Sequence, residues 1–318
     1  MITNEESATP ALCRLQLGRE LRLLRSAAGL TSTQVVRKLI CSPSKLTRLE
    51  TGENAVVETA DVMALCEIYG ATPEKRELLL GYAAVTKTKK DWWQSPEYRP
   101  AINPTFKAYL GLEATAQALH TYHSEYVPGL LQSEGYARAI YQRAPGALSP
   151  DEVERMVAVR MNRQEAMHRP EGSLKLAVII NESVIRRQVG GPAGMRAQIE
   201  HLIERASHPA VRVQIVPFRV GIHAGMNGAF TLLKFEDALP IVYLENLGAA
   251  SVVRKRGDVA QYEEAFTDLQ MVAMGPEESL GMIKEAIKEF RCARTRISLC
   301  RTPAGSRRAT ATTWAASA

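Results

Sequence analysis

The chain has 318 residues, enough for two domains that each bury a core, and its composition is that of an ordinary globular protein. Its five cysteines show neither CxxC nor zinc-ligand spacing, which argues against a disulfide scaffold or a metal site. No apolar run approaches the roughly 20 residues of a membrane span, and the polar N-terminus is unlike a signal peptide. We therefore expect a cytoplasmic protein with no membrane association.

The net charge of +6 is distributed unevenly along the chain. Residues 12–52 contain eight Arg and Lys against two Glu, and residues 291–318 contain six Arg and no acid. The segment between them is net acidic. Basic segments of this kind favour contact with nucleic acid. For residues 291–318 the simpler interpretation, a solvated and disordered basic tail, is the one we predict.

Five short helices are predicted in the first part of the chain. Leu17, Leu21 and Leu24 fall on one helical face, and Gly29 ends that helix. The predicted ranges are 14–28, 32–39, 43–51, 59–69 and 73–81. Short connections join them, so the sequence predicts an all-α domain over residues 14–83, preceded by a flexible N-terminus, 1–13.

The third helix carries its own start and stop signals. Ser42 is a good N-cap, Pro43 suits the first helical position, and Gly52 suits the left-handed residue that ends a helix. Its apolar and polar faces are separate: Leu46 and Leu49 lie on one, and Ser44, Lys45, Thr47 and Arg48 on the other. A helix whose outer face has hydroxyls and cations is what the DNA major groove accepts.

A polar, proline-punctuated linker is predicted at 84–105, where the pair Trp92-Trp93 is expected to pack one domain on the other. Beyond it, residues 106–290 predict an α+β domain with a small sheet. The expected helices are 106–118, 133–143, 149–167, 193–206, 258–273 and 276–290, and the expected strands are 174–180, 211–216, 229–235 and 241–244.

From Arg25 to Gly52 the pattern RxxxGLTxxxVxxxLxxSPSKLTRLETG resembles the helix-turn-helix family of the lambda-repressor/Cro (xenobiotic-response-element, XRE) type. The resemblance implies that helix 32–39 crosses the DNA backbone and helix 43–51 enters the major groove. By position, Ser44 and Arg48 match readers of base edges. Lys45 and Thr47 match phosphate or base contacts, and Ser32 and Ser42 match phosphate contacts.

The same resemblance gives two residues a structural role. Arg25 and Glu50 match positions that often form an ion pair in this family. Two residues depart from the pattern: Val36 stands where the family usually has a small residue, and Ile40 where it usually has Gly. Both positions lie where the two helices approach closely, so larger residues there are expected to change the angle at which helix 43–51 enters the DNA groove.

The remainder resembles the C-terminal domain of bacterial antitoxin-like transcriptional regulators. The matching motifs are Trp92-Trp93, YLGLE at 109–113, VPGLLQ at 127–132, RMNRQ at 160–164 and VQIVP at 213–217. The resemblance implies a domain that senses an input or binds a partner.

Four polar residues of this domain are candidates for that partner or ligand site. Arg160, Arg163 and Gln164 lie one turn apart on a predicted helix; they either pair with Glu113 or Glu182 or form an anion or partner site. The fourth, His223, lies in the glycine-rich segment GIHAGMNG, which is a loop between strands or a mobile lid.

Enzymatic function lacks support in the sequence. No phosphate-binding GK[ST] loop or nucleophile elbow is present, and the spacing of His120 and His123 alone is a weak metal signal, so both are expected at the surface or at helix ends. We expect no catalytic residue, metal or cofactor. The sequence predicts a homodimeric transcriptional regulator that binds double-stranded DNA. The alternatives are an antitoxin-like protein that binds a small partner protein and autoregulates, and a repressor controlled by a small-molecule effector.

Overall fold

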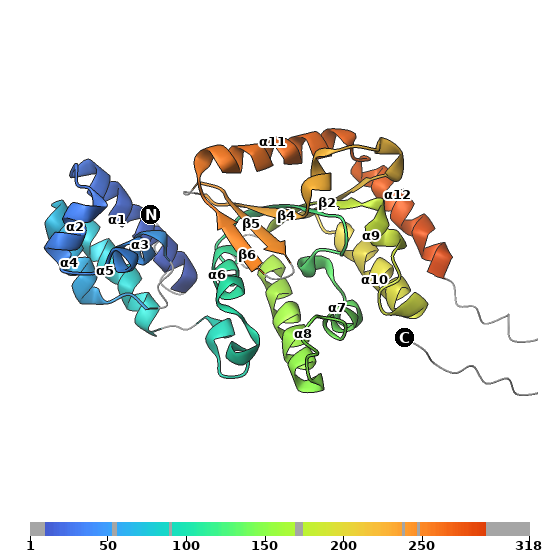
Figure 1. Cartoon of the computed structure of the whole chain (residues 1–318), viewed down its shortest axis with the longest axis horizontal. Helices are drawn as coiled ribbons and strands as arrows, with labels where there is room; N and C mark the ends of the chain where they lie inside the picture. Colours follow the sequence, from blue (N-terminus) through green and yellow to red (C-terminus); the bar gives the residue numbers. More distant parts are fainter. Residues whose placement is uncertain are drawn as a thin grey trace, which may run out of the picture.

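The computed structural model describes residues 10–52, 56–88, 91–168, 174–236, 239–246 and 249–290. These residues form a helical bundle followed by a larger domain built on one sheet (Figure 1). The multidomain architecture expected from the sequence, an all-α bundle plus an α+β domain, is confirmed. The tail predicted at 291–318 lies outside the described residues.

The bundle consists of five helices around a core of aliphatic side chains. Leu17 and Leu21 of the first helix are fully buried, as are Val35 and Leu79. The helices are α1 (Pro10–Ala27), α2 (Ser32–Leu39), α3 (Pro43–Thr51), α4 (Thr59–Tyr69) and α5 (Pro73–Thr88). Burying these apolar faces against one another stabilises helices that are too short to be stable alone.

The domain boundaries differ from those predicted. Helix α1 begins at Pro10, inside the stretch 1–13 expected to be flexible, because Ala11 and Cys13 are buried. The predicted linker is also packed: Trp93 and Ile102 belong to the core of the sheet domain. Two short 3-10 helices, η1 (Trp92–Gln94) and η2 (Arg99–Ala101), lie within it.

The sheet has six strands in the order β3-β2-β1-β4-β5-β6. The first three pair in parallel, and β4, β5 and β6 continue the sheet in antiparallel pairing. The strands are β1 (Ala118–His123), β2 (Lys175–Asn181), β3 (Val211–Val216), β4 (Phe230–Lys234), β5 (Ile241–Asn246) and β6 (Ala249–Val253). Sequence patterns missed β1 and β6, since ALHTYH carries two histidines and AASVV is short and rich in small residues.

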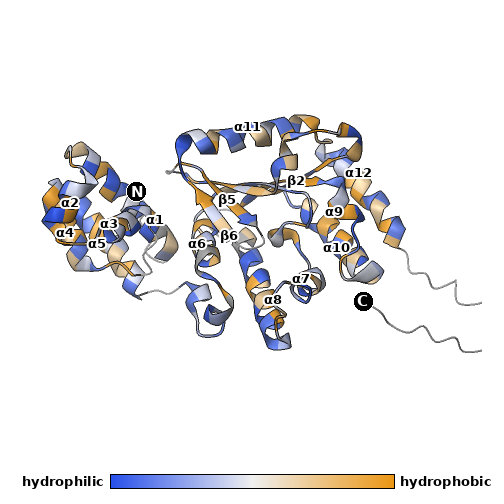
Figure 2. Cartoon of the chain, in the orientation of Figure 1, coloured by the Kyte–Doolittle hydropathy of each residue, from blue (hydrophilic) through white to orange (hydrophobic). Residues whose placement is uncertain are grey.

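Helices cover both faces of the sheet (Figure 1). Helix α11 packs on one face through Phe266 and Leu269, and the other helices of the domain lie mainly on the opposite side. These helices are α6 (Pro104–Glu113), α7 (Glu134–Tyr141), α8 (Pro150–Gln164), α9 (Glu182–Arg186), α10 (Gly191–Ala206), α11 (Arg256–Val272) and α12 (Pro276–Ala286). Hydrophobic residues concentrate in the strands between these layers (Figure 2). Within the described ranges, the structure has no helix of the length and apolarity that a bilayer crossing requires.

Helix α1 joins the two domains through helix α6. Arg14 donates from Nη2 to Oδ2 of Asp91 at 2.9 Å, and both side chains are buried. Ala11 packs into the same core as Trp93, and the backbone of Gly111 on α6 approaches Ala11. One end of α1 therefore rests on the sheet domain while the rest of the helix belongs to the bundle.

Candidate functional site

The helices α2 and α3 form a capped pair joined by a short turn. Thr31 accepts from the N–H of Gln34, whose side chain accepts in return from the N–H of Thr31, a complete capping box. Ser42 accepts from the N–H of Lys45, and Gly52 ends α3 in the left-handed conformation with φ of 72°. The start and end of α3 that the sequence predicted are thus confirmed by the local structure.

The turn between these helices places Ile40 in the left-handed region, with φ of 54°, and leaves its side chain 90% exposed. A β-branched residue rarely adopts this conformation, because its Cβ crowds the following carbonyl oxygen at a cost of about 1–2 kcal/mol. The neighbouring Val36 carbonyl accepts the N–H groups of Ile40 and Cys41, which closes α2. The departure of Ile40 from the usual Gly is therefore a point of backbone strain.

Helix α3 is held against α1 by a close approach and an ion pair. A Cβ on Gly18 would lie 2.7 Å from the carbonyl oxygen of Leu49, so the contact requires glycine. Arg25 donates from Nε and Nη2 to the two carboxylate oxygens of Glu50 at 2.6 and 2.8 Å. The hydrogen bond to Glu50 raises the pKa of Arg25 above its ordinary value. Arg22 adds a bond from Nη2 to the Glu50 carbonyl at 2.9 Å. These contacts fix the orientation of α3.

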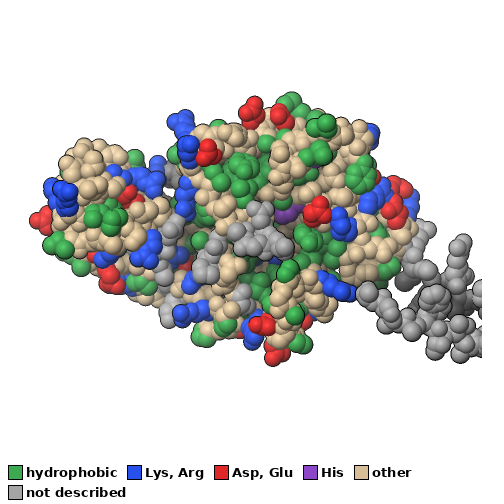
Figure 3. All heavy atoms as spheres, viewed as in Figure 1, with side chains coloured by type: hydrophobic (Ala, Val, Ile, Leu, Met, Phe, Trp, Pro, Cys, Tyr) green, Lys and Arg blue, Asp and Glu red, His purple; other side chains and the backbone are tan. Residues whose placement is uncertain are grey.

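The outward face of α3 carries the residues that the resemblance assigned to DNA. The structure leaves Ser44, Thr47 and Arg48 exposed, and Ser32 is exposed at the start of α2. Within the described part of the chain, no carboxylate lies within ion-pair distance of Arg48. Figure 3 shows lysine and arginine side chains on the visible face of the bundle, interspersed with a few acidic ones.

Four of the residues assigned to DNA already have partners within the protein. Lys45 donates from Nζ to Oδ1 of Asp61 at 2.8 Å, and the Thr47 hydroxyl donates to the Pro43 carbonyl at 3.0 Å. The hydroxyl of Ser42 caps the helix and lies 3.1 Å from that of Ser44. Contact of Lys45 with DNA would therefore compete with Asp61, whereas Arg48 is available without such a cost.

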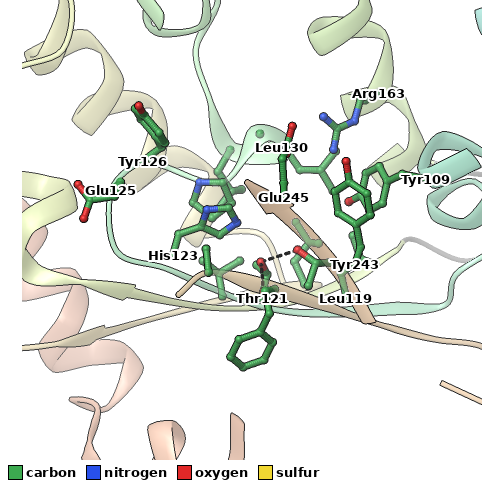
Figure 4. A pocket seen from close by; sticks show the side chains of 18 of the residues that line it. Tyr109, Leu119, Thr121, His123, Glu125, Tyr126, Leu130, Arg163, Tyr243 and Glu245 are labelled. Carbon is green, nitrogen blue, oxygen red and sulfur yellow. Dashed lines mark hydrogen bonds between the residues drawn. The ribbon is translucent and has the colours of Figure 1, made fainter. Parts of the chain in front are cut away.

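The sheet domain encloses a cavity of about 610 Å³ on the sheet face opposite α11 (Figure 4). Leu119, Thr121 and His123 of β1 form its floor, and Tyr243 of β5 lies beside them. Helices α6 and α8 and the 3-10 turn η3 (Gly129–Leu131) complete the walls. The sequence could not predict this cavity, because its floor is a strand that the residue pattern did not reveal.

Arg163 borders the cavity as half of a buried ion pair. It donates from Nε and Nη2 to the carboxylate oxygens of Glu113 at 2.8 and 2.7 Å, and Tyr109 donates its hydroxyl to Glu113 at 2.7 Å. Burial is the largest single influence and lowers the pKa of Arg163, but the charge of Glu113, its hydrogen bonds and the nearby tyrosines together raise the pKa above its ordinary value. Burial, followed by the Glu113 charge, raises the pKa of Tyr109. Arg163 is thus paired with Glu113 within the domain, which is one of the two alternatives that the sequence left open; the other was an anion or partner site.

Arg160 borders the same cavity but has a different environment. Its Nε and Nη2 donate to the Tyr141 hydroxyl at 3.1 and 2.6 Å, and the guanidinium lies 5.4 Å from the centre of that ring. None of the salt bridges among described residues includes Arg160. A Cβ on Gly129 would collide with its Nη1, so glycine in the turn makes room for the guanidinium. Its charge is solvated in part by a phenol, and no acid in the described part of the chain forms an ion pair with it.

His123 and His120 lie on opposite faces of β1, as residues three apart in a strand must. His123 faces the cavity; burial, followed by the charges of Arg160 and Arg163, lowers its pKa to about 4. His120 stacks on Phe266 at 4.7 Å, and burial lowers its pKa to about 4 as well. The expectation that both lie at the surface or at helix ends was wrong, and they cannot share a metal ion.

The four residues predicted as a partner or ligand site do not come together. Gln164 donates from Nε2 to the carbonyl of Gln132 at 2.7 Å and braces the turn that follows Val127. His223 lies on the other face of the sheet, where it packs edge-on against Tyr122 at 5.8 Å between ring centres. Of the four, Arg160 and Arg163 reach the cavity, and sequence patterns did not place them beside Tyr109, Thr121 and Tyr243.

Comparison with known proteins identifies both domains. A family model described as a helix-turn-helix domain matches residues 16–79, which defines the class of protein as a DNA-binding regulator. A second model, described as a domain of unknown function (DUF5753), matches residues 106–285, more than half of the chain. The chain belongs to the family of proteins with this DUF5753 domain. No curated protein and no solved structure matches the chain.

Proposed function

We propose that the protein is a sequence-specific transcriptional regulator that inserts α3 in the major groove of its operator. The observation that carries this proposal is the exposed face of α3, where Arg48 has no acidic partner among the described residues while Leu46 and Leu49 hold the helix in the core. An Arg side chain reads guanine through two parallel hydrogen bonds to O6 and N7, worth about 1–3 kcal/mol of discrimination. Ser44 lies one turn before Arg48 and would contact the adjacent base.

The remaining predicted contacts position the helix on the phosphate backbone. Ser32 and Ser42 are at or next to the N-termini of α2 and α3, where backbone N–H groups favour phosphate. Lys45 and Thr47 flank the reading residues. Proteins of this architecture bind two half-sites about one helical turn apart, so we propose a homodimer on a near-palindromic operator.

A gel shift on the DNA upstream of its own gene tests the proposal. Arg48→Ala should weaken specific binding by about tenfold or more and relax the preference at one base pair. Arg76→Ala on α5 makes the same change in net charge outside the helix pair and should leave sequence preference unchanged. Equal effects of the two substitutions, or binding without sequence preference, would refute base reading by α3.

We also propose that the sheet domain supplies the regulatory input. Of the alternatives considered from the sequence, control by a small molecule has a specific observation in its favour, the 610 Å³ cavity. Helix α6 supplies Phe106 and Tyr109 to that cavity and contacts α1 at Gly111. Helix α1 in turn packs on α3 at Gly18. When a ligand shifts α6, the displacement is therefore passed through these packed contacts to α1 and from α1 to α3.

A further inference from the structure

We propose that the cavity of the sheet domain binds a small aromatic molecule with a single anionic group, which Arg160 holds. This inference names the ligand class for the regulatory input proposed above and rests on that proposal only for its regulatory consequence. It is carried by three features of the cavity: its apolar walls, one unbalanced cation and one buried hydroxyl without a partner.

The size and walls of the cavity suit a flat organic molecule. Its volume of about 610 Å³ lies within the range of small-ligand sites. Phe106, Tyr109 and Tyr243 present aromatic rings, with the rings of Tyr109 and Tyr243 4.2 Å apart between centres. Aliphatic side chains from Leu119 and Val178 complete the apolar surface. An aromatic body can stack on these rings and displace water from them.

Arg160 supplies the charge that selects an anion. The neighbouring Arg163 is paired with Glu113, whereas Arg160 has the Tyr141 hydroxyl and, among the described residues, no acidic partner. The excess positive potential is felt at His123, whose pKa both arginines lower. A carboxylate, sulfonate or phosphate that meets Arg160 in this partly buried position gains a charge-assisted hydrogen bond.

Tyr243 supplies an unused hydrogen-bonding group. Its side chain is 5% exposed, and no described protein group pairs with its hydroxyl. Figure 4 shows the ring rising from β5 beside Tyr109 and Arg163, along the wall of the cavity. A buried hydroxyl without a partner is costly, and a polar group of a ligand would remove that cost.

Two acidic side chains limit the charge of the ligand. Glu125 and Glu245 are exposed residues of the lining, and neither forms an ion pair with Arg160. Glu125 is also paired with Arg187 at 2.7 Å. Glu245 projects from β5 on the same side as Tyr243, and its carboxylate would repel a second negative charge (Figure 4). The site therefore favours a monoanion over a dianion.

The test compares two fluorescent probes that share their rings, 8-anilinonaphthalene-1-sulfonate and the neutral N-phenyl-1-naphthylamine. Both are titrated into the full-length protein. Arg160→Gln should weaken binding of the sulfonate about tenfold, as expected for a lost charge-assisted bond, and change binding of the neutral probe less than twofold. Arg219→Gln, an exposed arginine away from the cavity, should leave both unchanged.

Two further variants keep the test independent of folding. Tyr243→Phe removes a hydroxyl without a protein partner, so it should weaken sulfonate binding a few-fold with no decrease in Tm. Glu245→Gln should tighten sulfonate binding. The proposal is overturned if Arg160→Gln affects both probes equally, or if Glu245→Gln weakens sulfonate binding. Operator binding measured with and without the probe reports separately on the proposed function, since loss of probe binding need not alter DNA recognition.

Discussion

His123 shows how position changes the chemistry of a single residue. On a surface helix it would titrate near pH 6.5, but on β1 it is half-buried, and this burial together with the charges of two arginines lowers its pKa to about 4. The unfolded chain binds a proton at this residue below pH 6.5, and the folded protein does so only near pH 4. Stability from the neutral imidazole is therefore complete above pH 6.5 and is lost as the pH falls toward 4.

We predict that the free energy of unfolding decreases between pH 7 and pH 5, with His123 contributing about 2 kcal/mol of the decrease. His123→Gln cannot take up this proton and should show a flatter dependence over the same range. Urea unfolding of the full-length protein at pH 7, 6 and 5 measures both profiles. Parallel profiles for the two proteins would contradict the assignment.

The turn between α2 and α3 holds Ile40 in a strained, left-handed conformation. Ile40→Gly should stabilise the protein by about 1 kcal/mol, because glycine removes the left-handed strain and only part of the gain is offset by chain entropy. Ile222 is 92% exposed and does not have a positive φ, so Ile222→Gly should give no gain. Thermal unfolding compares the two variants. Destabilisation by Ile40→Gly would show that the exposed Ile40 side chain makes a stabilising contact.

At the scale of elements, α1 is the helix that contacts both α3 of the bundle and α6 of the sheet domain. It packs on α3 at Gly18, pairs with Glu50 through Arg25, and contacts α6 through Ala11 and Arg14. A change at its contact with α3 should therefore alter both the stability of the bundle and the orientation of the reading helix.

Gly18→Ala tests this contact. The new Cβ would lie 2.7 Å from the Leu49 carbonyl oxygen, which is helix backbone and cannot rotate away, so we expect destabilisation of about 1–3 kcal/mol and weaker operator binding. Gly81→Ala on α5 is the matched control: it meets open space and should stabilise its helix by about 0.5–1 kcal/mol. Chemical denaturation and the operator gel shift measure both effects. Equal stability changes would contradict the close approach.

At the scale of the whole molecule, the connection between the domains is structured. The Arg14–Asp91 pair is buried, with side-chain exposures of 8% and 2%, and Trp93, two residues after Asp91, is buried in the core of the sheet domain. A connection of this kind transmits displacements that a flexible linker would absorb. Coupling between the cavity and the reading helix should therefore depend on it.

Asp91→Asn should destabilise the protein by about 3 kcal/mol, because it removes the carboxylate that pairs with the buried charge of Arg14. We expect calorimetry to show the bundle and the sheet domain unfolding in more separate transitions than in the wild type. Glu200→Gln, in an exposed pair with Arg196, should cause no measurable change. A single unaltered transition in Asp91→Asn would show that the domains are coupled by other contacts.

The sequence by itself determined the helix-turn-helix domain, because its information is local. Ser42, Pro43 and Gly52 specify the ends of α3 through bonds within a few residues, and the spacing of Leu46 and Leu49 specifies its buried face. Only the tertiary structure decided the nature of the second domain. Strand β1 is defined by its pairing with β2 and β4, which are distant in the sequence. The periodicity of its residues therefore predicted neither the positions of its two histidines nor the cavity beside the strand. Arg160 and Arg163 look alike in the sequence, and only the folded chain pairs Arg163 with Glu113 and gives Arg160 the hydroxyl of Tyr141.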